Sequence, residues 1–283
     1  MHLSALTFQR QFARFEQQVR YHSGGRPFIS FRDGLPAQWE DYKAEVRKEA
    51  LRRLEVQKWK RADVGKGRIL DRIINVIEIN EPSRGLRNNL VAWQNRYGHK
   101  KRSHRALLDA KSDASARRSF EQWALDFFQD RLNDADAFER FRELAGERYD
   151  IVAYVFFLKD WNRFMPIAPT TFDKAFQLLE LDVITAHQCS WDNYARYNAA
   201  LLEVQSALRD VAEVADARLI DAHSFCWMLM RLELPDAEPP VVIPLPEPLT
   251  GLEAILPSTR RLRDDGKHQP VDEKEFAKRQ AEQ

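Results

Sequence analysis

A seam of apolar residues at alternating steps of three and four constrains the fold of this chain more than any other feature. It runs through residues 190–211 and consists of Tyr194, Tyr197, Leu201, Val204, Leu208 and Val211. Residues at this spacing share one face of a helix, and that face has to be buried against a second helix. We expect residues 216–232 to be the partner. The pattern therefore predicts helix-on-helix packing.

The same kind of spacing organises the first part of the chain. A helix that ends at Ser23-Gly24-Gly25 places on one face the residues Phe8, Phe12, Phe15 and Val19. A second, long helix is predicted from Pro36 to about residue 61, and a third follows Gly67. Between the first two helices, residues 27–31 are compatible with a short strand.

A fourth helix is predicted from the spacing of Leu86, Leu90, Trp93 and Tyr97, with Gly98 closing it. The strongly basic stretch 95–107 would then begin at a helix C-terminus. Cations are favoured there because the last carbonyl groups and the helix dipole attract positive charge. One or two basic residues are explained in this way without any ligand.

The second part of the chain also has helical patterns. Residues 103–119 are polar and are interpreted as a hinge. A new helix then begins with Phe120, Trp123, Phe127 and Phe128. Residues 149–158 are apolar on almost every side, and we expect a buried helix there because both neighbours are helical. Thr170 followed by Asp173 has the form of a capping box.

Charge and proline content divide the chain into three parts. Residues 1–118 carry 26 Lys/Arg against 13 Asp/Glu, whereas the rest carries 18 against 30. Eight of the 13 prolines lie in residues 235–283, which are expected to be extended because this composition cannot form a helix. The prediction is a mainly α fold with at most a short strand element. It has a basic helical domain (1–118), an acidic helical domain (119–234) and a proline-rich tail (235–283).

Composition also bears on location. The sequence has no apolar run of membrane-spanning length, and its first residues lack the hydrophobic block of a secretory signal. Its two cysteines provide no disulfide framework. These features predict a cytoplasmic protein with no membrane partner.

The stretch NRYGHKKRSHRAL, residues 95–107, contains no acidic residue and is the main candidate for a phosphate-binding surface. Several cations presented together bind phosphate groups, and a nearby aromatic ring can stack on a base. The residues assigned to this nucleic-acid site are Arg84, Arg87, Trp93, Arg96, Tyr97, Lys100, Lys101, Arg102, His104 and Arg105. The alternative interpretation is a solvated helix end, because a basic face without a recognised motif is often merely exposed.

The glycine-containing loop VGKGR adds Lys66 and Arg68 to this site. The loop precedes a helix, so its backbone N–H groups and these two side chains can point at a phosphate. It lacks the full G-x-x-x-x-G-K-[ST] pattern and does not indicate an NTPase. An ordinary glycine-containing loop is the alternative.

The one set that resembles metal ligands is His187, Cys189, His223 and Cys226. Its spacing is not a standard zinc spacing, and Leu219 and Leu229 place the face of Cys226 in the core. We therefore expect buried core residues and neither a metal nor a cofactor. Glu78 and Glu81 are the best carboxylate pair for a metal-dependent nuclease, but further ligands would have to converge on them in space.

Three segments carry a resemblance to a known group of proteins: YDIVAYVFFLKDWNRFMPIAPTTFDKAF, QCSWDNY and DAHSFCWML. Together they resemble a helical module of uncharacterised bacterial restriction and phage-defence proteins, some of which carry an HNH nuclease domain. The resemblance covers about residues 86–232, and this chain has no HNH ββα-metal motif. It implies recognition of nucleic acid rather than cleavage, with a recognition turn lined by Phe164, Pro166, Thr171, Phe172 and Asp173. A proline-fixed helix start packed by two phenylalanines is the alternative for that turn.

These features support three functions in order. The first is a nucleic-acid-binding, non-catalytic component of a bacterial defence or DNA-processing system, with DNA or RNA as ligand. A protein partner would bind the acidic half or the C-terminal tail. The second is a helical scaffold whose basic half contacts an acidic protein. The third is a metal-dependent nuclease with an unrecognised site.

Overall fold

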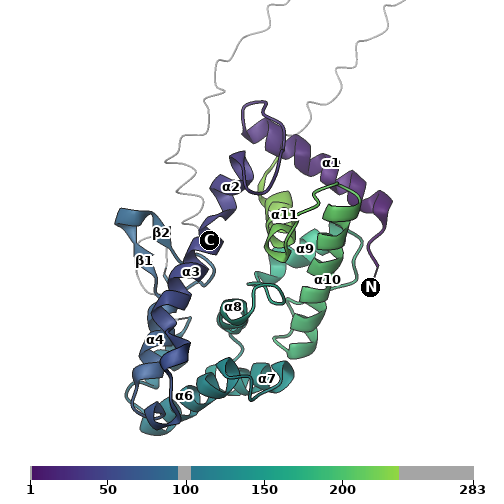
Figure 1. Ribbon diagram of the computed structural model, residues 1–283. Coiled ribbons are helices and arrows are strands. Elements are labelled where there is room, and N and C mark those ends of the chain that lie inside the picture. Colours follow the sequence, from purple (N-terminus) through teal and green to yellow (C-terminus); the bar gives the residue numbers. More distant parts are fainter. Residues whose placement is uncertain (1, 95–102, 236–283) are drawn as a thin grey trace, which may run out of the picture. The chain divides into compact units, whose positions relative to one another are not determined.

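The computed structural model describes residues 2–94 and 103–235, and the part of the chain up to Glu233 forms one compact unit (Figure 1). Within the described residues the fold is mainly helical, with one two-stranded antiparallel sheet. The predicted fold class is confirmed. The predicted tail lies outside the described residues except at its first position, Pro235.

The first part of the chain contains α1 (Ala5–His22), α2 (Gly34–Glu40), α3 (Tyr42–Leu54) and α4 (Arg68–Ile77). The predicted single helix from Pro36 to residue 61 is wrong in its length. It is divided between α2 and α3. Helix α3 ends at Leu54, because the left-handed backbone of the next residue, Glu55 (φ +48°), cannot continue a helix. Two 3₁₀ turns follow, η1 (Val56–Lys58) and η2 (Arg61–Asp63).

The strand predicted at residues 27–31 is absent from the structure. Phe28 and Phe31 instead pack on Phe15 of α1, with ring centroids 5.2 and 5.8 Å away. The sheet forms between β1 (Asn80–Glu81) and β2 (Leu86–Arg87), with Asn80 opposite Arg87 and Glu81 opposite Leu86. The 3₁₀ turn η3 (Pro82–Arg84) connects them.

The helix predicted through Leu86 and Trp93 is also wrong. Hydrogen bonds within the segment and to α4 hold it in a non-helical conformation. The Asn88 side chain donates to the Ile77 carbonyl at 2.9 Å, and the Trp93 indole donates to the Asn88 carbonyl at 2.9 Å. The apolar spacing reflects burial of Leu86 and Trp93 in the core rather than a helical face.

The second part contains α5 (Arg105–Asp109), α6 (Ala114–Phe128), α7 (Asp134–Ala145), α8 (Tyr149–Lys159), α9 (Pro169–Leu178), α10 (Trp191–Asp210) and α11 (Leu219–Arg231). The hinge predicted at residues 103–119 is wrong, because α5 and the start of α6 occupy it. Asp113 begins α6 by accepting hydrogen bonds from the backbone N–H groups of Ser115 and Ala116.

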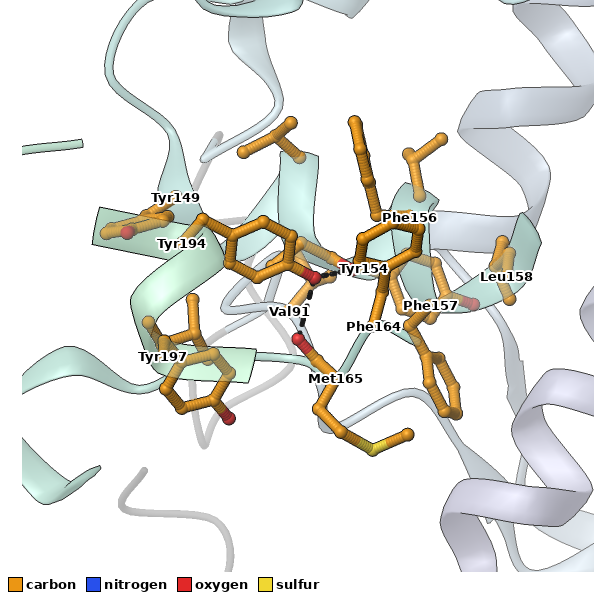
Figure 2. Close-up of a cluster of buried hydrophobic side chains, with 14 of the residues drawn as sticks. Val91, Tyr149, Tyr154, Phe156, Phe157, Leu158, Phe164, Met165, Tyr194 and Tyr197 are labelled. Carbon is orange, nitrogen blue, oxygen red and sulfur yellow. Dashed lines mark hydrogen bonds between the residues drawn. The ribbon is translucent and has the colours of Figure 1, made fainter. Parts of the chain in front are cut away.

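Helix α8 is buried on every side, as expected from its continuous apolar sequence. It contacts α3 and α7 and lies near the centre of Figure 1. Figure 2 shows its Phe156 beside Phe164 and Tyr194, and the Tyr194 hydroxyl donates to the Met165 carbonyl at 2.9 Å. The buried hydroxyls of Tyr154, Tyr194 and Tyr197 all donate to backbone carbonyls, which offsets the cost of burying them.

The predicted pairing of the α10 seam with residues 216–232 is confirmed, because α10 packs against α11. Helix α11 in turn contacts α9 and α1. The capping box predicted at Thr170 and Asp173 is absent. The Asp173 carboxylate accepts from Thr185 and from the Ala186 backbone N–H group, and it thereby holds the loop after α9.

Residue 118, where the charge of the chain changes sign, lies inside α6. Helix α6 packs on α4, and α1 packs on α10 and α11. The division into basic and acidic domains stays a prediction drawn from charge. In the part of the chain that the structure describes, no helix has both the length and the apolar composition needed to cross a membrane.

Candidate nucleic-acid interface

The glycine loop before α4 surrounds a carboxylate of the chain itself. Gly65 and Gly67 have φ of +88° and +87°, and these conformations turn successive N–H groups toward the same point. Glu121 of α6 lies at that point. One of its oxygens accepts from Gly65 at 2.6 Å and Gly67 at 3.1 Å, and the other accepts from Ile69 at 2.9 Å and Leu70 at 3.1 Å.

Glu121 therefore takes the position that we expected a phosphate to take. Glu121 is 0% exposed, and its negative charge faces the positive end of the α4 dipole. The prediction that these backbone N–H groups bind an external phosphate is corrected. Lys66 and Arg68 are exposed, and no ion pair of either residue is seen within the described chain.

Two arginines of α6 pack against this loop. The Arg117 guanidinium donates to the Gly65 carbonyl at 3.1 Å and to the Lys111 carbonyl at 2.9 Å. The Arg118 guanidinium lies against Gly65, since a β-carbon added at Gly65 would be 3.4 Å from it. Lys66 lies in the loop that these two arginines contact, and Arg68 follows it directly. We call these four residues the loop–α6 surface: Lys66, Arg68, Arg117 and Arg118.

An open pocket of about 710 Å³ adjoins this surface. Three exposed arginines line it, Arg61 from η2, Arg118 from α6 and Arg140 from α7. No ion pair of these three is seen among the residues that the structure describes. Sequence analysis missed Arg61, Arg118 and Arg140 as a group, because only the packing of α6 against α7 and η2 brings them together.

The predicted site residue Arg84 is partly neutralised. Its guanidinium lies 2.7 Å from a Glu81 carboxylate oxygen and 3.5 Å from a Glu49 oxygen. Arg52 and Arg53 also pair with the buried Glu49 carboxylate, and their hydrogen bonds hold the pKa of Glu49 well below its usual range. Part of the positive charge counted in residues 1–118 is therefore paired with Glu49 and Glu81 of the same segment.

Trp93 and His104 are buried and are not placed to contact a nucleic acid. Trp93 is 4% exposed, which leaves no ring face for a base. The His104 side chain is 0% exposed, and its Nε2 lies 2.7 Å from a Glu78 carboxylate oxygen. Glu78 thus contacts His104, whereas Glu81 contacts Arg53 and Arg84. The metal-dependent nuclease stays a hypothesis drawn from the sequence.

The other predicted site residues differ in how far the structure places them. Arg105 is exposed and pairs with Asp109 at 3.1 Å, whereas Arg87 is half-buried in β2. Five of them lie outside the described residues: Arg96, Tyr97, Lys100, Lys101 and Arg102.

A buried polar cluster joins α2 and α3 to α11. The Lys43 ammonium contacts the Glu40 carboxylate and lies 2.8 Å from His223 Nδ1. The His223 Nε2–H donates to the Pro166 carbonyl at 3.1 Å. Burial lowers the pKa of Lys43 and of His223, and it raises the pKa of Glu40. The cluster connects core helices and has no opening to a substrate, because its side chains are almost fully buried.

The four residues considered as metal ligands are dispersed. His223 and Cys226 are buried in α11, Cys189 is buried in a loop, and His187 is exposed. The core assignment of His223 and Cys226 is confirmed. Burial raises the pKa of the Cys189 thiol to about 12 and raises that of Cys226 as well. Across residues 2–94 and 103–235, no three His, Cys, Asp or Glu side chains gather to hold a metal ion.

No family model, curated protein or solved structure matches this chain.

Proposed function

We propose that this protein binds nucleic acid through phosphate contacts on the loop–α6 surface. The observation that supports the proposal is the packing of Arg117 and Arg118 on the loop that carries Lys66 and Arg68. Cations from two segments of the chain are thus presented together. Phosphate groups of a nucleic acid strand are bound by cations in such an arrangement.

Glu121, the acid inside the glycine loop, forms no ion pair with a described cation of this surface. Glu121 is directed inward, and its oxygens are taken up by backbone N–H groups. Neighbouring cations behave differently, since Lys111 pairs with Asp71 and Arg72 pairs with Glu55. Lys66, Arg68 and Arg118 are exposed and available to an external anion.

The proposed role is binding without catalysis. The buried Lys43 cluster is closed to substrates, and the Glu78 and Glu81 carboxylates each contact basic side chains of the chain itself. A cytoplasmic role in a bacterial defence or DNA-processing system is part of the proposal and is drawn from the sequence. An acidic protein is the alternative ligand of the same surface.

Salt dependence of binding tests the proposal. We expect fluorescein-labelled duplex DNA to bind, with log K falling linearly against log salt. The Lys66→Gln/Arg68→Gln variant should flatten that slope by up to about 1.8, at about 0.9 per lost phosphate contact. Arg14→Gln/Lys174→Gln is the matched control, because it removes two exposed cations from α1 and α9. Absence of binding to DNA and RNA at low salt would overturn the proposal.

The basic stretch outside the described residues needs its own variant. Lys100→Gln/Lys101→Gln/Arg102→Gln should flatten the slope by up to about three units if all three side chains contact phosphate. Wild-type slope and affinity in this variant would exclude the stretch. Retained binding there, together with a loss in the Lys66→Gln/Arg68→Gln variant, would assign binding to the loop–α6 surface.

A further inference from the structure

The pocket beside the loop–α6 surface has walls that are fixed by core contacts. The Trp123 indole donates to the Ala137 carbonyl at 2.8 Å and so joins α6 to α7. Its ring lies 4.6 Å from that of Phe141 and stacks on Phe127 at 5.2 Å. Arg118 and Arg140, which project from these two helices, are therefore carried by a rigid support.

The balance of charge in the pocket is positive. Arg61, Arg118 and Arg140 face two acids, Asp126 and Glu143. The Asp126 carboxylate accepts from Gln122 at 2.7 Å and lies 3.4 Å from the guanidinium of Arg131, which does not line the pocket. Arg131 therefore partly neutralises the charge of Asp126. The exposed Glu143 offsets one of the three arginines. An anion that enters the pocket therefore meets net positive charge.

The chemistry of three arginines favours a phosphate monoester. A guanidinium presents paired N–H donors that match two phosphate oxygens. A terminal phosphate has three free oxygens and a charge between about −1.5 and −2 at neutral pH. An internal phosphodiester has two free oxygens and a single charge. Three guanidinium groups thus complement a strand end better than a strand interior.

The size of the pocket exceeds that of a phosphate ion. About 710 Å³ lies in the range of sites for small organic ligands, roughly 300–1,000 Å³. Val64 and Leu144 provide apolar wall, against which the sugar or base of an end nucleotide can rest. The pocket is therefore suited to a phosphate with its attached nucleoside.

We infer that the Arg61–Arg118–Arg140 pocket binds the terminal phosphate of a nucleic acid strand. The inference rests on the proposed nucleic-acid function and specifies which part of the ligand this pocket recognises. The loop–α6 cations contact internal phosphates and supply affinity without regard to the end. The pocket adds a preference for a phosphorylated end.

Matched oligonucleotides test this inference with the full chain. Single strands of one sequence are prepared with a 5′-phosphate, a 3′-phosphate or hydroxyl groups at both ends, and carry an internal fluorophore. We expect one phosphorylated form to bind about tenfold tighter than the hydroxyl form, as one or two charge-assisted hydrogen bonds allow. The phosphorylated form that binds more tightly identifies the strand end. Inorganic phosphate should compete with it for the pocket and reduce the difference in affinity.

Three variants separate the pocket from the rest of the surface. Arg140→Gln should abolish the preference and leave affinity for the hydroxyl form unchanged. Arg118→Gln should also abolish the preference, and it should weaken the hydroxyl form as well, because Arg118 belongs to both the pocket and the loop–α6 surface. Lys66→Gln/Arg68→Gln should weaken all three oligonucleotides by the same factor and keep the preference. Arg140 is exposed, so an unchanged thermal transition checks that its variant is folded.

The outcomes distinguish the two proposals. Equal affinity of the wild type for all three oligonucleotides overturns the terminal-phosphate inference and leaves the proposed function standing. A preference that survives in both Arg118→Gln and Arg140→Gln overturns the assignment to this pocket. No binding to any oligonucleotide removes the proposed function and the inference with it.

Discussion

The Glu121 carboxylate lies 2.6 Å from the Gly65 backbone nitrogen, so a residue of α6 occupies the anion-binding position at the start of α4. A helix N-terminus that follows a glycine loop attracts an anion whatever its source. Here the anion is internal, and it ties two helices that are separated along the chain. The loop cations are left on the outside, where an external ligand can reach them.

The first prediction concerns this internal anion. Glu121→Gln should lower the free energy of unfolding by about 2–3 kcal/mol, because charge-assisted hydrogen bonds are lost and the amide NH₂ would face backbone N–H donors. Urea unfolding of both proteins measures the change. Glu16→Gln, an exposed change on α1, is the control and should be nearly neutral. Equal stability of the Glu121 variant and the wild type would contradict the role assigned to this carboxylate.

The second prediction concerns acid stability. Arg52 and Arg53 hold the pKa of Glu49 below that of the unfolded chain, where a glutamate titrates near about 4.3. This stabilisation is present above the unfolded pKa and is lost as the pH falls toward the folded pKa. Urea unfolding between about pH 6 and pH 3 should therefore show a steeper loss in the wild type than in Glu49→Gln. Identical slopes would show that the fold does not stabilise the ionised form of the Glu49 carboxyl group.

A third expectation concerns the buried pair of Lys43 and Glu40. Lys43→Met leaves the Glu40 carboxylate buried without its cation and should cost about 3–5 kcal/mol. Burial raises the pKa of Glu40, and removal of Lys43 takes away the largest opposing influence. The variant should therefore be more stable in mildly acidic than in neutral solution, because the protonated carboxyl is tolerated and ionisation disfavours folding as the pH rises. Adding Glu40→Gln should recover part of the loss at neutral pH and remove this pH dependence.

The role of Cys226 is open to a direct check. We expect Cys226→Ala to cost roughly 1 kcal/mol or somewhat more, through lost packing in α11. Both native thiols should react slowly with a thiol reagent at neutral pH, because burial raises the pKa of Cys226 and of Cys189 and blocks access. Stoichiometric zinc in protein purified without added metal, or rapid labelling of Cys226, would refute the assignment to the core.

Removal of the tail should leave the folded unit intact. Residues from Leu234 onward fall outside the compact unit that ends at Glu233. A chain that stops after Pro235 keeps the contact of His22 Nε2 with the Glu233 carbonyl at 2.7 Å. Its thermal transition should be nearly unchanged. A fall of many degrees would show that the tail belongs to the packed structure and would remove it as a separate binding arm.

Local pattern was enough to predict the helices that bury a continuous face. The α10 seam, the Phe8–Val19 face of α1 and the apolar α8 were all predicted, because the periodicity of apolar residues follows from helix geometry alone. The same rule failed at Leu86–Trp93. There the apolar side chains are buried by neighbouring segments, and bonds from Asn88 and Trp93 hold the backbone out of a helix.

The candidate site shows the same limit more sharply. Charge counting identified the basic half, and the glycine loop indicated an anion-binding helix start. Neither could show that Glu121 is the anion, that Glu49 contacts Arg84, or that Arg61 and Arg140 share a pocket. These pairings join residues far apart in the chain. A side chain's position in sequence sets its helix face, whereas the packing of one helix on another decides which distant charge it meets.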